Sequence, residues 1–240
     1  MRKLLHYYHA YVAGEADVWK RIMVEHFTAL ESSGLLARLN VPVRIGLVGD
    51  PFERYDAWQW LDTHLPAFEV VAAERTGFEQ VTLHQLWERT KVGTDAVLYA
   101  HTKGGAHPSP RQDQWRHELT QSLVHGWRQC VRHLDYSDVV GAYHIVNDGE
   151  AQGYAGDGAN AVAAALNKEL GITLPVDPVF PEVGEAIFAG NFFWAASDWI
   201  LSLLAPLERS RYDAETWIGG ANRYGRKPTV HNVQEWMMRQ

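Results

Sequence analysis

The chain has 240 residues, 46% hydrophobic and 21% charged, proportions that fit an ordinary globular protein with one substantial domain. Its 22 Lys and Arg against 29 Asp and Glu leave a net charge of -7, which argues against a broad electrostatic grip on nucleic acid. The single cysteine, Cys130, excludes an internal disulfide framework, and its place among apolar residues favours a buried, inert thiol.

No stretch of the sequence approaches the roughly 20 apolar residues needed to span a bilayer. The N-terminal segment begins with basic residues, but His and Tyr interrupt its short apolar part, which is atypical of a signal peptide. We therefore expect a cytoplasmic protein. Aromatic residues are abundant (10 Trp, 10 Tyr and 8 Phe), and most are expected in the core, while others can stack on sugars or bases.

Strand-like and helix-like segments alternate through the first half of the chain. Strands are expected at residues 3–11, 43–48, 68–73 and 96–100, and helices at residues 18–30 and 56–64 and from a capping-box pattern at residues 76–79 through Trp87. This alternation predicts an α/β fold class with a mostly parallel central sheet flanked by helices.

The second half begins with the clearest helix start in the sequence, Ser109 followed by Pro110, and that helix is expected to continue to Leu134. Further elements are predicted as strands at residues 139–146 and 187–195 and helices at 157–170, 197–204 and 214–218. Nothing in the sequence marks an internal repeat or a second domain. We therefore expect a single domain over residues 1–240.

The segment VLYAHTKGG (residues 97–105) is an apolar strand that ends in His101, Thr102, Lys103 and two glycines. Ligands of open α/β sheets bind beyond the carboxyl ends of the strands. There, Lys103 offers a compact charge for a diphosphate, and His101 offers a hydrogen-bond donor or a metal ligand. A solvated turn without a ligand is the structural alternative.

Two later segments carry further candidate residues. Gly190 and Asn191 precede three aromatic residues. Gly190 can form a turn that brings the Asn191 amide against a sugar, and the Trp194 ring can stack on that sugar. A buried strand is the alternative for this run. The segment RYDAETW (residues 211–217) contains carboxylates that can act as a general base, or that simply stabilise the first turn of a helix.

Several catalytic signatures are missing from the sequence. It contains no GxGxxG, GxxxxGK[ST], GxSxG, HExxH or DxD motif, which weakens the dehydrogenase, P-loop and α/β-hydrolase interpretations. His6 and His9 lie three residues apart on a predicted strand, so their rings point to opposite faces and a shared metal site is not expected.

Four motifs are spread over nearly the whole chain: YYHAYVAG, YAHTKGG, GNFFWAAS and ETWIGG. As a set they resemble a family of bacterial and viral glycosyltransferase-like proteins. The order of the motifs is also similar to that of GT-A (Rossmann-type) glycosyltransferases. The resemblance implies a nucleotide-sugar-binding half at residues 1–105 and an acceptor-binding half at residues 106–240.

The resemblance implies roles for residues at the matching positions. The donor-binding set would be Tyr8, His9, Tyr11, His101, Lys103, Gly190, Asn191 and His231. Glu215 would be the catalytic base, and Trp194, Trp217 and Arg211 would bind the acceptor. In GT-A enzymes a DxD motif at the end of the fourth strand holds a divalent metal. This sequence has His101-Thr102-Lys103 there instead, which leaves a requirement for Mn²⁺ or Mg²⁺ open.

The function expected from residues and resemblance is transfer of a sugar from a nucleotide-sugar donor to an acceptor hydroxyl. The acceptor is either a glycan or a hydroxymethylated base in DNA, as viral relatives suggest, and the stereochemical course, inverting or retaining, stays open. A non-catalytic nucleotide-binding or sugar-binding module is the main alternative. A metal-dependent hydrolase using dispersed His and Asp residues is a weaker one. The sequence does not indicate the oligomeric state.

Overall fold

A computed structural model of the chain describes residues 2–74, 79–90, 95–105, 108–145 and 186–204. The strands are β1 (Leu4–Tyr11), β2 (Val43–Val48), β3 (Phe68–Glu74), β4 (Ala96–His101), β5 (Val139–Ile145) and β6 (Ala186–Ala196). The helices are α1 (Ala16–Ser32), η1 (Leu36–Arg38), α2 (Pro51–His64), α3 (Glu79–Thr90), α4 (Pro110–Thr120), η2 (Gln121–His125), α5 (Trp127–His133) and α8 (Ser197–Leu204). The predicted helices at 157–170 and 214–218 lie outside these residues.

The strands form one sheet in the order β3-β2-β1-β4-β6-β5. β1 pairs in parallel with β2 and β4, and β2 pairs in parallel with β3, whereas β6 runs antiparallel to β4. β1 has neighbours on both edges and is buried along all of its length except Tyr11. The predicted fold class, α/β with a mostly parallel sheet flanked by helices, is confirmed.

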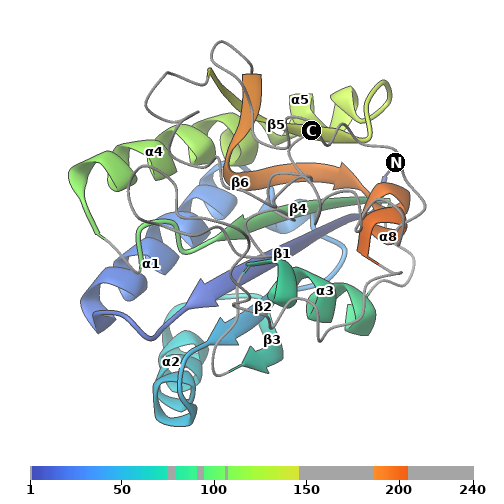
Figure 1. Cartoon of the computed structure of the whole chain (residues 1–240). Coiled ribbons are helices and arrows are strands. Elements are labelled where there is room, and N and C mark those ends of the chain that lie inside the picture. Colours follow the sequence, from blue (N-terminus) through green and yellow to red (C-terminus); the bar gives the residue numbers. More distant parts are fainter. Residues whose placement is uncertain (1, 75–78, 91–94, 106–107, 146–185, 205–240) are drawn as a thin grey trace, which may run out of the picture. The chain divides into compact units, whose positions relative to one another are not determined.

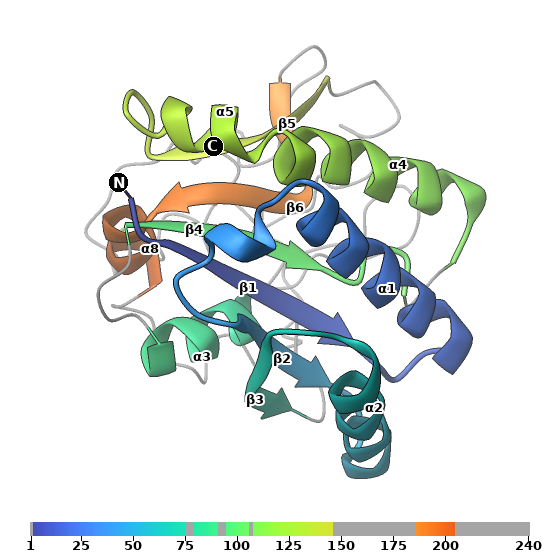
Figure 2. The same ribbon diagram turned by 180° about the vertical axis from the view of Figure 1, so that it is seen from behind.

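Helices cover both faces of the sheet. Figure 1 shows α3 in front of β1 and β2, and Figure 2, from behind, shows α1 and α4 over the opposite face. The alternation of side chains along β1 matches this arrangement. His6 reaches His26 on α1 at 2.7 Å between the two Nε2 atoms, and His9 Nδ1 lies 2.8 Å from Thr82 Oγ1 on α3. The prediction that His6 and His9 face opposite sides is confirmed.

Two helix predictions need correction. The helix expected at residues 56–64 begins at Pro51, because the Asp50 side chain accepts hydrogen bonds from the Phe52 and Glu53 amides and Glu53 bonds back to the Asp50 amide. The helix expected to run unbroken to Leu134 is instead three segments. A π-helical turn, η2, follows α4, and α5 starts only after Gly126.

Cys130 lies on α5 and is buried, as predicted. Burial raises the pKa of its thiol to about 11, so the group is protonated at neutral pH. A protonated thiol is a poor nucleophile. The described structure therefore gives Cys130 a packing role.

The chain divides into two compact units. One comprises Met1–Ala142 and Phe192–Ile200, and the other comprises Tyr143–Asn191 and Leu201–Gln240. The sheet edge described below belongs to the first unit. The expected single domain, with halves at residues 1–105 and 106–240, stays a prediction. In the described part of the chain, no helix has the length and apolar character required to cross a bilayer.

Candidate functional site

The candidate site is the edge of the sheet where β1 and β4 end side by side. Their carboxyl ends are paired in parallel as far as His9 and His101. From β1 the sheet continues through β2 and β3 on one side, and β4 lies on the other side, so the strand order reverses between β1 and β4. Open α/β sheets bind ligands at such a reversal, beyond the carboxyl ends of the strands. The HTKGG segment therefore begins at the point where this topology favours a ligand (Figure 1).

Backbone hydrogen bonds hold the segment after β4 in place. The Thr102 amide donates to the His9 carbonyl at 3.0 Å, and the Thr102 hydroxyl accepts from the Tyr11 amide at 2.8 Å. Gly104 has a φ of 87°, a conformation that favours glycine. The loops after β1 and β4 also approach closely, because a Cβ on Gly14 would lie 2.6 Å from the Gly105 carbonyl oxygen. These contacts fix the two strand ends relative to each other.

Lys103 is half-buried, and its ammonium lies over the ring of Trp115, with Nζ 4.3 Å from the centroid. This cation–π contact comes from α4, the helix that follows the loop. The Lys103 carbonyl accepts a hydrogen bond from the buried Arg116 guanidinium, from Nη1 at 3.0 Å. The ammonium and the backbone carbonyl of Lys103 therefore both contact residues of α4.

Arg116 is the residue that sequence reasoning missed. Its guanidinium pairs with Glu25 at 2.8 Å and with Asp113 at 2.9 Å, and so connects α1 and α4 to the loop that carries Lys103. The sequence holds one local signal, since Asp113 and Arg116 are spaced to pair on a helix. Glu25 is distant in the chain, and no sequence pattern links it to Arg116.

The donor-binding residues predicted on β1 lie in different environments. Tyr8 is buried against the His26 ring, and burial raises the pKa of its phenol well above the usual value. His9 is buried on the α3 face, and Tyr11, at the end of the strand, is partly exposed. His101 is buried too, with its ring 4.9 Å from that of Phe192. Of these four, Tyr11 has the accessible side chain at the edge of the sheet.

The predicted residues on β6 are only partly described. Gly190 and Asn191 lie within the strand, and Trp194 is fully buried. The Trp194 indole N–H donates to the Leu123 carbonyl of η2 at 2.9 Å, so the ring packs between the sheet and that turn. The predicted roles of Arg211, Glu215, Trp217 and His231 concern residues outside the described part of the chain.

A divalent metal does not fit the described residues at this edge. The segment after β4 supplies a lysine and a buried histidine, whereas hard cations favour oxygen ligands, carboxylates above all. Within the described ranges, no group of three or more His, Cys, Asp or Glu side chains is arranged to hold a metal ion. No step is therefore assigned to a metal here.

Comparison with known proteins gives matches to solved structures and a match to one family model. No curated protein matches the chain. A solved structure from Desulfovibrio desulfuricans G20, described as a "putative nucleotide-diphospho-sugar transferase", aligns with 98% of this chain and 74% of its own, at a TM-score of 0.36 and 12% identity. At this TM-score the fold is defined by the strand order of the sheet and not by the match. The model of a family described as a domain of unknown function, DUF8361, matches residues 7–146, and the chain belongs to that family.

Proposed function

We propose that this protein is a glycosyltransferase of GT-A-like type that binds a nucleotide-sugar donor at the carboxyl ends of β1 and β4. The observation that carries the proposal is the position of Lys103, directly after β4 and at the reversal of strand order. The resemblance of the HTKGG and GNFFWA motifs to glycosyltransferase-like proteins supports the same reading.

In the proposed reaction, an acceptor hydroxyl attacks the anomeric carbon of the donor sugar, and the bond to the nucleoside diphosphate breaks. Negative charge then grows on the leaving diphosphate, and the Lys103 ammonium stabilises it. Glu215 takes the proton of the attacking hydroxyl. His101 is buried behind the loop, so we propose that it supports the strand end that carries Lys103.

Tyr11 and the loop after β1 would border the nucleotide. The Tyr11 amide is bonded to Thr102, so the ends of the two strands would meet the donor as one rigid edge. Gly190, Asn191 and His231 stay predictions for donor binding. Trp217 and Arg211 stay predictions for acceptor binding.

The acceptor we favour is a glycan hydroxyl. A net charge of -7 opposes the approach of a DNA backbone, whose phosphates are bound through Lys and Arg. A hydroxymethylated base in duplex DNA is the alternative acceptor. Binding of such a duplex that weakens steeply with added salt would favour DNA over a glycan.

The donor site is tested with Lys103→Ala, titrated calorimetrically against a panel of nucleotide sugars with and without Mn²⁺. We expect donor affinity to fall about tenfold or more, because a charge-assisted contact to phosphate is lost. Lys20→Ala is a matched control, since Lys20 also lies over a tryptophan ring, that of Trp19 on α1. Unchanged donor affinity in Lys103→Ala would contradict the phosphate role.

The catalytic base is tested separately with Glu215→Gln. We expect donor binding to be retained while turnover falls about a hundredfold or more, the usual contribution of a general base. Near-normal transfer by this variant would remove Glu215 from the mechanism.

A non-catalytic nucleotide-binding or sugar-binding module is the second candidate, because the sequence lacks the DxD carboxylates. Slow hydrolysis of the donor without an acceptor distinguishes the two. A transferase hydrolyses its donor slowly, whereas a binding module leaves it intact.

A further inference from the structure

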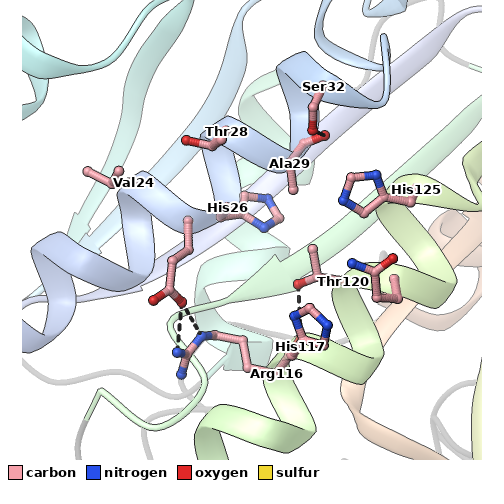
Figure 3. Close-up of a pocket in the computed structure, with 11 residues that line it drawn as sticks. Val24, His26, Thr28, Ala29, Ser32, Arg116, His117, Thr120 and His125 are labelled. Atoms are coloured by element: carbon pink, nitrogen blue, oxygen red, sulfur yellow. Dashed lines mark hydrogen bonds and ion pairs between the residues drawn. The ribbon is translucent and has the colours of Figure 1, made fainter.

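A pocket of about 370 Å³ lies between α1 and the α4–η2 segment, on the face of the sheet opposite α3. Figure 3 shows it from close by, with residues of α1 on one side and residues of α4 and η2 on the other. It is lined by Val24, Glu25, His26, Thr28, Ala29, Ser32, Arg116, His117, Thr120, Gln121 and His125. All of these belong to the compact unit that holds the sheet edge, but none lies on that edge.

Small side chains and an unusual turn create the space. Thr28, Ala29 and Ser32 face the pocket from α1, and Thr120 faces it from α4. At the other end η2 is a π-helical turn, closed by a bond from the Gly126 amide to the Gln121 carbonyl at 3.1 Å. π-turns are rare in helices and are often found at functional sites. Gln121 and His125, the first and last residues of this turn, both line the pocket.

The floor of the pocket is His26, and its hydrogen bonds define its tautomer. His6 Nδ1 lies 3.0 Å from the Leu98 carbonyl oxygen, which only accepts, so His6 carries its proton on Nδ1. In a neutral ring His6 Nε2 then accepts, and His26 must donate from Nε2. Burial lowers the pKa of both rings, that of His6 to about 4, which keeps them neutral. The hydrogen bonds therefore leave Nδ1 as the acceptor of the His26 ring, which lines the pocket.

The charges in the pocket are already paired. Glu25 bonds to Arg116, and Arg116 bonds to Asp113, which also pairs with Arg21, so two acidic groups balance two basic ones. An anion would meet the Glu25 carboxylate, and a cation would meet the Arg116 guanidinium. The remaining polar lining groups are hydroxyls, an amide and imidazoles, and Val24 and Ala29 add an apolar part to the lining. This set suits an uncharged ligand with several hydrogen-bonding groups.

We propose that this pocket binds a small uncharged polyhydroxylated molecule of monosaccharide size. The hydroxyls of the ligand would donate to His26 Nδ1 and exchange hydrogen bonds with Gln121, Thr28 and the exposed imidazoles of His117 and His125. The ligand displaces no ion pair on entry. This site is separate from the donor edge between β1 and β4.

Arg116 gives the pocket a physical connection to that edge, because it lines the pocket and donates to the Lys103 carbonyl. A ligand that contacts Arg116 would therefore shift the loop that carries Lys103. This connection rests on the proposed donor site, whereas binding in the pocket does not.

The experiment follows the imidazole NMR signals of the full chain during titration with D-glucose, D-galactose, N-acetyl-D-glucosamine and myo-inositol, with inorganic phosphate in parallel. We expect at least one of the four polyols to shift His26, His117 and His125 together at millimolar concentration, while His133 does not move. Phosphate should shift none of the three. No response to any polyol, or a response to phosphate alone, would overturn the proposal.

Two variants connect any response to the pocket. Thr28 is exposed and lines the pocket, so Thr28→Trp fills the space and should abolish the shifts. Glu31→Trp, also exposed on α1 but not in the lining, should leave them unchanged. Shifts that persist in Thr28→Trp would overturn the assignment.

The connection through Arg116 is tested by measuring nucleotide-sugar affinity with and without the polyol. A several-fold change in that affinity supports the connection, and an unchanged affinity removes it without affecting the pocket.

Discussion

His6 and His26 show how burial determines the state of a titratable side chain. Both rings are buried between β1 and α1, beside the phenol of Tyr8 and near the Arg116–Glu25 pair. Desolvation lowers the pKa of His6 from 6.5 to about 4. It also lowers the pKa of His26 well below its usual value, and the charge of His6 contributes a smaller decrease. The two neutral rings share one hydrogen bond, from His26 Nε2–H to His6 Nε2, and protonation of His6 at Nε2 would remove its acceptor.

This arrangement predicts that acid destabilises the fold well above the range where carboxylates titrate. The unfolded chain binds protons at these histidines below pH 6.5, whereas the folded chain does not until about pH 4 for His6, so stability falls as the pH drops through that interval. His6 should lower the free energy of unfolding by about 2 kcal/mol between pH 7 and 5, and His26 should add to that loss, because burial lowers its pKa as well. Urea unfolding as a function of pH measures the change.

The matched comparison is the double variant His6→Gln with His26→Gln, set against His117→Ala, which alters an exposed ring. We expect a flatter pH dependence in the first and an unchanged one in the second. A wild-type profile that is flat between pH 7 and 5 would contradict the prediction.

Trp194 gives a second prediction at this scale. Trp194→Phe removes the hydrogen bond to the Leu123 carbonyl and leaves a gap in a fully buried site, which should cost about 1–3 kcal/mol of stability. Trp58→Phe is the control, because Trp58 is 46% exposed on α2. Unfolding measurements on both variants test the packing role. Normal stability together with a raised KM for the acceptor would favour the predicted stacking role instead.

At the scale of elements, the start of α2 depends on one side chain. Asp50 Oδ1 accepts from the Phe52 amide at 2.8 Å and from the Glu53 amide at 2.9 Å. Asp50→Ala should lower the free energy of unfolding by about 1 kcal/mol, and Asp50→Asn should lose much less, because asparagine also caps helices. Equal losses in the two variants, measured by urea unfolding, would show that the cap is not the cause.

The start of α4 was predicted from its local signal, the capping box that starts α2 was missed, and the interruption of the helix after α4 was not predictable. Ser109 and Pro110 open α4 as predicted, because the Ser109 hydroxyl accepts from the Gln112 amide within the same turn. The π-turn at η2 interrupts an apolar pattern that continues with helical spacing through Trp127. Its partners are distant in sequence, since Trp194 of β6 bonds to the Leu123 carbonyl and Trp127 bonds to Ser33 beyond α1. Local spacing carries no information about such contacts.

At the scale of the whole sheet, strand positions were predictable and strand order was not. The predicted strand at 43–48 matches β2, and that at 96–100 differs from β4 only at its last residue. Each of these segments is an apolar run, so its own residues favour a buried strand. The position of β4 beside β1 follows from packing across the sheet. Only this strand order shows that the HTKGG segment, predicted to follow a strand, lies where the order of the strands reverses.

The sequence by itself determined the class of fold, most strands, the start of α4 and the opposite orientation of His6 and His9. These properties depend on residues that are close in the chain. Only the tertiary structure decided that Arg116 would join Glu25 to the Lys103 carbonyl, that His26 would complete a buried pair, and that Trp194 would face the core. Those outcomes depend on contacts between distant segments, whose free energy comes from packing and desolvation in the assembled fold.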